Sequence, residues 1–348
     1  MLGRVKTAVG LDIGSSAIKI VEIEQRREGS RIVNYGVADL PPEAIVEGEI
    51  MDRQLVVETV QNLFESREVR PRHVNTGVSG RGVIVKKITM EKLPLSEARE
   101  AVHWEAEQHV PYDINDVALD FQILDTDVGP NQMQVLLVAA KRDLITAHAD
   151  LVREAGLVPA VIDVNSFALQ NAAESNYDFL KGEVIAMVNV GAELTNINLV
   201  QGGVPLYTQD LSLGGNNFVE ALQKRYQVSR EEALTALRSK DANSSLDVAP
   251  VVKTYCADLG VALERSLVYL KSNGDTDHID RILISGGGAR IRGLSELLGD
   301  KMKVPVELAN PMKRIACAEG VFRPQETDDL GPQLAVGIGL ALRKAHEK

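Results

Sequence analysis

The chain has 348 residues, 45% hydrophobic and 25% charged, a composition typical of soluble globular proteins. Its formal net charge of −11 argues against a nucleic-acid partner. Its two distant cysteines offer no disulfide framework, and no apolar run reaches the roughly 18 residues that span a bilayer. We therefore expect a cytoplasmic protein that contacts a membrane only through a partner.

The N-terminal part of the chain predicts a meander of three antiparallel strands followed by a helix. Residues 7–13 alternate between the two faces of a strand, and residues 17–25 and 31–40 read as two more strands after short turns. Residues 52–69 carry apolar side chains at helical spacing. This order places the polar turn at residues 12–19 at the tip of a hairpin.

The next block predicts an inserted subdomain. It reads as strands in 74–93, a helix in 94–111 with Ser96 as N-cap, strands in 117–125 and 133–140, and a helix closed by Gly156. Trp104, the sole tryptophan, lies off the apolar stripe of the first helix, where it can anchor a partner peptide or pack within the subdomain. The basic strand around Lys87 can guard a sheet edge or bind an acidic tail.

Residues 184–211 repeat the order of elements in residues 7–40. In this comparison Asn189 falls on Asp12, and Gly191 falls on Gly14. The rest of the chain predicts helices at 215–227, at 229–239 with a Ser229–Glu232 capping box and near 250–272, then a strand that runs into glycines, and two more helices. The repeat indicates two related halves.

The first polar turn combines groups that suit a phosphate. Gly14 permits a tight turn whose backbone N–H groups can bind an anion, and Ser15 and Ser16 add hydroxyls. Lys19 adds a positive charge, and Asp12 can hold a hydrated Mg²⁺. A solvent-exposed hairpin explains this turn equally well when it is taken alone.

Two later turns strengthen the phosphate interpretation. The turn at residues 189–195 repeats the first one, with Gly191 for close backbone approach and Thr195 as a hydroxyl donor. Residues 284–298 predict a strand that runs into three glycines at a helix N-terminus, which suits a phosphate or a flat base. No Walker-type loop is present, and we interpret the glycines of "AVGIGLALR" as close helix packing. Together the three turns predict a clamp for a nucleoside triphosphate between two halves.

These motifs resemble a known superfamily. DxGxxxxK in the first hairpin, NxGxxxT in the second and "SGGGA" are similar to those of the actin-like ATPases. The segments "HVPYDINDVALDFQIL", "VLLVAAKRDLI", "LVREAGLVPAVIDVNSFAL" and "PQLAVGIGLALR" resemble the PilM family of type IV pilus assembly, a branch near FtsA. The resemblance covers nearly the whole chain.

The resemblance implies an α/β fold: a duplicated, RNase H-like bilobed architecture with an FtsA/PilM-type inserted subdomain. The first lobe would comprise residues 1–80, 156–180 and 333–348, with residues 81–155 as the insert. The second lobe would comprise residues 181–215 and 276–332, and residues 216–275 would form its helical subdomain.

The resemblance also implies ATP and Mg²⁺ between the lobes, with Asp12 holding the metal. The expected nucleotide-binding residues are Asp12, Gly14, Ser15, Ser16 and Lys19 in the first turn, Asn189, Gly191, Glu193 and Thr195 in the second, Gly286, Gly287 and Gly288 in the third, and Gly214, Gly215 and Asn216 beside the ribose or base. Asn189 stands where catalytic relatives usually have Asp, and Asp163, Asn165 and Ser166 stand where relatives orient the attacking water. We therefore expect firm ATP binding with slow or absent hydrolysis.

The implied role is that of a scaffold in the inner-membrane platform of the type IV pilus. Its expected partner is the N-terminal cytoplasmic tail of a PilN-like inner-membrane protein, bound in a groove beside the insert. Pilus motor ATPases and self-association are further candidates. The alternatives are an FtsA-like cell-division or filament-forming protein, whose C-terminal membrane helix we do not expect here, a type II secretion component, and a phosphotransferase of the same fold.

Overall fold

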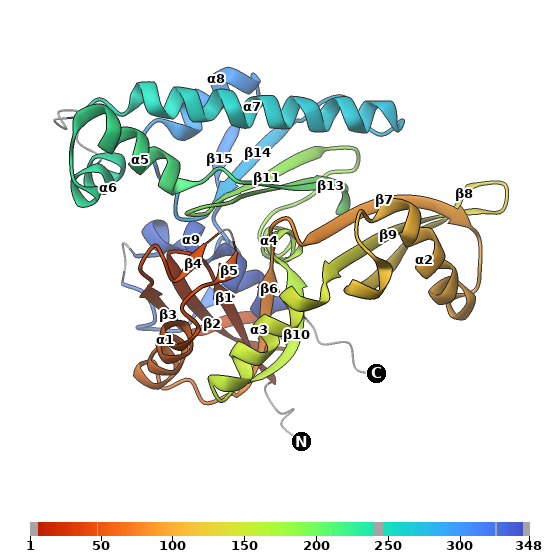
Figure 1. The fold of residues 1–348 in the computed structure, drawn as a ribbon, viewed down its shortest axis with the longest axis horizontal. Helices are drawn as coiled ribbons and strands as arrows, with labels where there is room; N and C mark the ends of the chain where they lie inside the picture. Colours follow the sequence, from red (N-terminus) through yellow and green to blue (C-terminus); the bar gives the residue numbers. More distant parts are fainter. Residues whose placement is uncertain (1–5, 47, 240–245, 324–325, 344–348) are drawn as a thin grey trace.

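The computed structural model describes residues 6–46, 48–239, 246–323 and 326–343. Two lobes, each built on a mixed β-sheet, lie one above the other, and an elongated subdomain projects from their side (Figure 1). Residues 344–347, the last of the helix expected over 332–347, lie outside the described ranges.

The first lobe is a six-stranded sheet in the order β10-β6-β1-β2-β3-β16. Its strands are β1 (Lys6–Ile13), β2 (Ala17–Arg26), β3 (Gly29–Asp39), β6 (His73–Val78), β10 (Val158–Val164) and β16 (Ala316–Cys317). The first three form the predicted antiparallel meander, and β6 and β10 run parallel to β1. The parallel strands therefore end at the same edge of the sheet.

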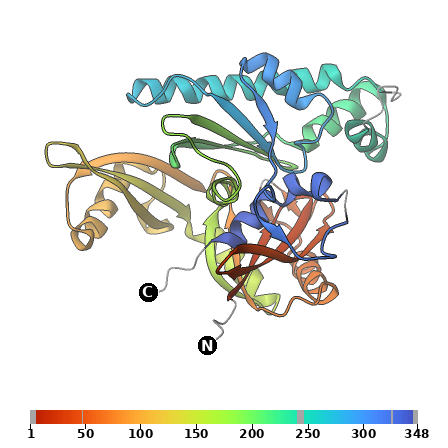
Figure 2. The same ribbon diagram turned by 180° about the vertical axis from the view of Figure 1, so that it is seen from behind.

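Helices cover both faces of this sheet, and a two-stranded ribbon lies beside it. The helices are α1 (Arg53–Ser66), α3 (Arg142–Glu154), α4 (Asn165–Glu174) and α9 (Glu326–Leu342), and the ribbon is β4 (Ile45–Val46) with β5 (Glu49–Ile50). Val9 and Leu11 of β1 pack with α1 and α3, whereas the intervening Gly10 lies against α9. The view from behind shows α9, in blue, across that second face (Figure 2).

The second lobe repeats the meander and adds parallel strands. Its order is β13-β12-β11-β14-β15, with β11 (Val184–Val190), β12 (Thr195–Gln201), β13 (Val204–Leu211), β14 (Arg281–Ser285) and β15 (Val306–Leu308). One face packs against α5 (Gly215–Tyr226), α6 (Arg230–Arg238), α7 (Ala249–Ser272) and α8 (Leu294–Met302). Helix α4 contacts β12 from the first lobe, and Asn198 donates a hydrogen bond to the Ser166 carbonyl there at 3.1 Å.

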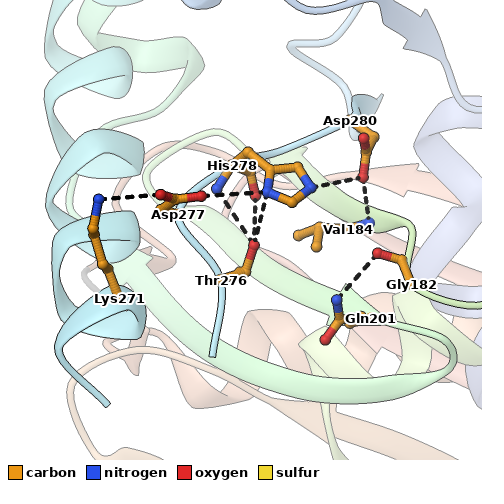
Figure 3. Close-up of polar contacts among 8 residues, drawn as sticks. All are labelled: Gly182, Val184, Gln201, Lys271, Thr276, Asp277, His278 and Asp280. Atoms are coloured by element: carbon orange, nitrogen blue, oxygen red, sulfur yellow. Dashed lines mark hydrogen bonds and ion pairs between the residues drawn. The ribbon is translucent and has the colours of Figure 1, made fainter. Parts of the chain in front are cut away.

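Polar contacts fasten the loop between α7 and β14 to the second sheet (Figure 3). Lys271 at the end of α7 pairs with Asp277 at 3.1 Å, and His278 lies between Asp277 and Asp280, 3.5 and 3.6 Å from their carboxylates. Asp280 in turn accepts a hydrogen bond from the Val184 N–H at 2.7 Å. The loop is thereby tied both to the helix that precedes it and to the start of β11.

The inserted subdomain has its own core. Strands β7 (Val83–Glu91), β9 (Gln132–Lys141) and β8 (Val117–Gly129) form an antiparallel sheet in that order, and a short 3-10 turn, Ile114–Asp116, precedes β8. Helix α2 (Leu95–His109) packs against the sheet through Ala98, Val102 and Ala106. Trp104 is 69% exposed, so packing within the subdomain does not explain it.

Three details of the sequence interpretation change. Helix α2 begins at Leu95 with Pro94 at the N-cap, so Ser96 lies inside the first turn and caps nothing. Helix α3, expected as the last element of the insert, packs Leu151 and Val152 into the core of the first lobe, because its apolar face meets α1 and β1. Strand β16, from a segment expected in the second lobe, pairs with β3 of the first.

Other details are confirmed. Gly156 follows α3 with a φ of +78°, and Ser229 and Glu232 form the capping box of α6. A Cβ on Gly339 would lie 1.7 Å from the Ala168 carbonyl oxygen, so the glycines of α9 do serve close helix packing.

Candidate functional site

A pocket of about 360 Å³ lies between the two lobes. The carboxyl ends of β1 and β6 and the start of α4 line it from the first lobe, and the ends of β11 and β14 line it from the second. Ligands of open α/β sheets bind at the carboxyl ends of parallel strands. The duplication places two such edges opposite each other, so one pocket receives side chains from both halves.

The first turn brings an ion pair to the pocket. Asp12 and Lys19 face each other across the β1–β2 hairpin, with Lys19 Nζ 3.0 Å from Asp12 Oδ2 and side chains only 9% and 13% exposed. Ser15 and Ser16 also line the pocket. The Gly14 N–H donates to the Ala17 carbonyl at 3.1 Å, so this N–H closes the turn and does not contribute to the expected anion-binding nest.

The second turn has the same register with different chemistry. Asn189 and Asn196 face each other across the β11–β12 hairpin, and Asn189 Nδ2 donates to Asn196 Oδ1 at 3.0 Å. The Gly191 N–H closes this turn by donating to the Leu194 carbonyl at 2.9 Å. Both asparagines, Gly191 and Glu193 line the pocket. The ion pair of the first hairpin is thus replaced by a neutral amide pair.

Thr195 and Gly214 do not line the pocket. Thr195 is fully buried, and its hydroxyl lies 2.6 Å from the Leu213 carbonyl and 2.6 Å from the Tyr255 hydroxyl. Because neighbouring residues of a strand point to opposite faces, Thr195 faces the core when Asn196 faces the pocket. A Cβ on Gly214 would lie 2.6 Å from the Ala192 carbonyl oxygen, so this glycine permits close packing beneath the turn.

The helix after Gly214 presents two expected residues to the pocket. Gly215 and Asn216 line it, and their N–H groups donate to the Gly191 and Ala192 carbonyls at 2.8 and 2.7 Å. The first N–H groups of α5 therefore bind the second turn. The Asn216 side chain accepts a hydrogen bond from Arg230 at 2.7 Å.

The third turn lines the pocket with all three glycines, but not at a helix N-terminus. Gly286 has a φ of +89°, and a Cβ on Gly288 would lie 2.4 Å from Val190 Cγ1. Gly287 has open space where a Cβ would be, so its backbone is accessible to a ligand. Helix α8 starts only at Leu294 after an intervening turn, so the positive end of its dipole does not lie at these glycines.

The part of the pocket wall that α6 forms was not predicted from the sequence. Helix α6 contributes Arg230, Leu234, Leu237 and Arg238, which are spaced along one face, and Ile291 lies with them. This end combines apolar side chains with two cations. Their helical spacing is visible in the sequence, but no local motif connects that helix to the hairpin turns.

Of the residues expected to orient water, only Asn165 reaches the pocket. Its Nδ2 donates to Ser79 Oγ at 3.1 Å, and its buried Oδ1 has no hydrogen-bond partner among the described residues. Asp163 instead lies 3.2 Å from Arg343, and burial raises the pKa of its carboxyl group. Ser166 is buried beneath β12.

The donor set fits a hydrated Mg²⁺ that also binds phosphate. Mg²⁺ usually keeps several waters and takes one or two carboxylates together with substrate phosphates. Asp12 could supply a carboxylate, whereas Asn165 Oδ1 is buried against Gly77 and is not open to the pocket. Within the described ranges, no group of three or more His, Cys, Asp or Glu side chains forms a site made of protein ligands alone.

Comparison with known proteins decides the family. The family model described as type IV pilus assembly protein PilM matches residues 10–345. The chain belongs to the PilM family. A solved PilM-PilN type IV pilus biogenesis complex contains a chain that is 30% identical, with a TM-score of 0.84 over 97% of this chain and 98% of that one.

More distant relatives confirm the actin-like fold of this PilM-family chain. FtsA of Bacillus subtilis is 23% identical over 351 residues, covering 87% of this chain and 78% of FtsA. MreB5 of Spiroplasma citri bound to AMPPNP is 11% identical, with a TM-score of 0.53 over 96% of this chain and 94% of that one. The duplicated bilobed fold expected from the motifs is therefore confirmed. In the described part of the chain, no helix is long and apolar enough to cross a membrane.

Proposed function

We propose that this PilM-family protein binds ATP with Mg²⁺ between its lobes and acts in the cytoplasm as a scaffold of type IV pilus assembly. The pocket carries this proposal, because two equivalent hairpins and a glycine turn converge on it from two sheets. The Lys19 ammonium, with Ser15 and Ser16, would receive the phosphates. Charge-assisted hydrogen bonds of this kind are stronger than neutral ones.

The α6 end of the pocket suits the nucleoside. Leu234, Leu237 and Ile291 provide apolar surface for a base, and Arg230 holds the Asn216 amide beside them. The accessible backbone of Gly287 lies on the pocket wall for a flat ligand. Bound Mg²⁺ would screen the negative charge of the phosphates, with Asp12 holding it through water.

We propose that hydrolysis is slow or absent. Phosphoryl transfer depends on positioned charge and an oriented nucleophile. In the second hairpin Asn189 brings no charge, and its amide is engaged with Asn196. Asn165 also lines the pocket, but its Nδ2 is engaged with Ser79 and its Oδ1 is buried, so neither is free to orient a water molecule. The chain would therefore use ATP to set a conformation.

We propose the cytoplasmic N-terminal tail of a PilN-like membrane protein as the partner, which would bring the chain to the inner membrane. The 30% identical PilM-PilN complex supports this proposal. Trp104 gives a local reporter, because it is the only tryptophan of the chain and lies exposed on α2 of the insert.

Two titrations test the proposal. Mg·ATP binding is measured by calorimetry, and binding of a fluorescein-labelled synthetic PilN-like tail by anisotropy. Saturable one-to-one binding of both ligands is expected, and a same-composition scrambled peptide is expected not to bind. Equally tight binding of the scrambled peptide would contradict the proposal that a PilN-like tail is the partner. A change in Trp104 emission when unlabelled tail is added would place the effect on the insert.

A further inference from the structure

A continuous chain of hydrogen bonds joins the pocket to the base of the inserted subdomain. Asn189 Nδ2 donates to Asn196 Oδ1 at 3.0 Å, and Asn196 Nδ2 donates to Asp210 Oδ1 at 2.7 Å. The other oxygen of Asp210 accepts the Gly80 N–H at 2.5 Å. We propose that Asp210 is a positioning residue that couples nucleotide binding in the pocket to the placement of the inserted subdomain. This inference rests on the proposed nucleotide site.

Asp210 fixes which group donates and which accepts in each of the side-chain hydrogen bonds between it and Asn189. An ionised carboxylate only accepts hydrogen bonds, so Asn196 must turn its amide nitrogen toward Asp210 and its oxygen toward Asn189. Asn189 then turns its nitrogen to Asn196 and its oxygen to the Ser285 hydroxyl, 3.3 Å away. The orientation of the Asn189 side chain in the pocket is thus set by the carboxylate of Asp210, which is two hydrogen bonds away.

Asp210 also joins two parts of the molecule. It lies on β13, the edge strand of the second sheet, whereas Gly80 belongs to the segment that leads from β6 into β7. Gly80 has a φ of +96°, and its neighbour Ser79 lines the pocket. Burial raises the pKa of Asp210, and the hydrogen bonds from Asn196 and Gly80 oppose that rise.

A second contact prevents β7 from pivoting freely about Gly80. Lys87 of β7 pairs with Asp275, and both side chains are largely buried. Asp275 belongs to the loop between α7 and β14. Other residues of this loop bind the end of α7 and the start of β11 (Figure 3). The first strand of the insert is therefore attached to the second lobe at two points. A shift of the second lobe toward a bound nucleotide would carry β7 with it.

Asp210→Asn separates coupling from binding. The amide has one acceptor oxygen in place of two, so it can satisfy either Gly80 or Asn196 and presents a donor to the other. Asp258→Asn removes the same charge from the exposed face of α7 and serves as the matched control. Thermal unfolding first shows that each variant is folded.

Hydrogen exchange with and without Mg·ATP measures the coupling. In the unsubstituted protein and in Asp258→Asn, Mg·ATP should slow exchange both in the pocket and in residues 79–91. In Asp210→Asn the pocket should still be protected, while the slowing in residues 79–91 should fall about tenfold, the order expected for one lost hydrogen bond to a charged acceptor. Equal slowing of residues 79–91 in Asp210→Asn and the control would overturn the proposal.

Two further arms keep the result decisive. Asp210→Ser removes the carboxylate altogether, outside the pocket lining, and should reproduce the loss even if Asp210→Asn does not fold; unchanged coupling there would also overturn the proposal. If Mg·ATP protects the pocket of the unsubstituted protein but not residues 79–91, only the coupling is wrong. If it protects neither region, the proposed nucleotide site fails as well.

Discussion

Asn189 occupies in the second hairpin the position that Asp12 occupies in the first, and each side chain binds the residue opposite it across the hairpin. Asp12 pairs with a lysine at 3.0 Å, whereas Asn189 pairs with an asparagine at 3.0 Å. The two halves of the pocket therefore share a backbone and differ in charge. This asymmetry leads to the first prediction.

Phosphate release should be far slower than the roughly 1–100 s⁻¹ typical of protein kinases. The reason is that the second hairpin supplies a neutral amide pair where a charged group could assist the transfer. A coupled-enzyme phosphate assay with saturating Mg·ATP checks this, with heat-denatured protein as the blank. Turnover within the kinase range in the absence of any partner would favour a phosphotransferase instead.

Thr195→Val should weaken folding without weakening ATP binding by the folded protein. Its buried hydroxyl serves the Leu213 carbonyl and the Tyr255 hydroxyl, and leaving such groups unpaired costs about 1–3 kcal/mol. Urea unfolding and calorimetry measure the two effects, and Thr195→Ser, which keeps the hydroxyl, is the control. A tenfold loss of ATP affinity in folded Thr195→Val would contradict this account, because it would indicate that Thr195 contributes to the nucleotide site.

Gly339→Ala should destabilise the first lobe. The new methyl group would lie 1.7 Å from the Ala168 carbonyl oxygen, so α4 and α9 must separate, and overpacking of this kind costs about 1–3 kcal/mol or more. Gly287→Ala meets open space and should change the free energy of unfolding by less than about 0.5 kcal/mol. Equal stabilities of the two variants in chemical unfolding would contradict this account of the glycines.

Acidification should destabilise the protein partly through His148. Burial lowers the pKa of this side chain from its ordinary value of 6.5, so the unfolded chain binds the proton more tightly than the native one. The stability contribution is present above that value and is lost as the pH falls below it. His148→Gln should reduce the fall in Tm between pH 7.5 and 5.5, whereas His103→Gln, at an exposed site, should not. The same pH dependence in all three proteins would refute this assignment.

The hairpins and their turns could be predicted from sequence because each rests on local signals. Strand alternation and a glycine after Asp12 and Asn189 set both turns, and the repeat supplied the register. The same alternation carried a signal that was not used: Asn196 lies opposite Asn189, as Lys19 lies opposite Asp12, so Asn196 rather than Thr195 faces the pocket.

The remaining parts of the site depend on long-range packing. Arg230 reaches the pocket because the helical layer of the second lobe folds over its sheet, and Asp210 meets Gly80 because two subdomains touch. The start of α8 at Leu294 likewise depends on a turn in which Gly288 binds the Val190 carbonyl at 2.9 Å. No spacing within one segment encodes these contacts.

Calorimetric titration of Mg·ATP into the unsubstituted protein and Lys19→Ala tests the central claim most directly. Lys301→Ala, which removes a lysine paired with Glu264 on the second lobe, is the control. The account predicts one site per chain, and a Kd raised about 10- to 150-fold in Lys19→Ala alone, as expected from about 1.5–3 kcal/mol for a hydrogen bond to a charged group. Absence of binding in the unsubstituted protein, or equal affinity in Lys19→Ala, would contradict it.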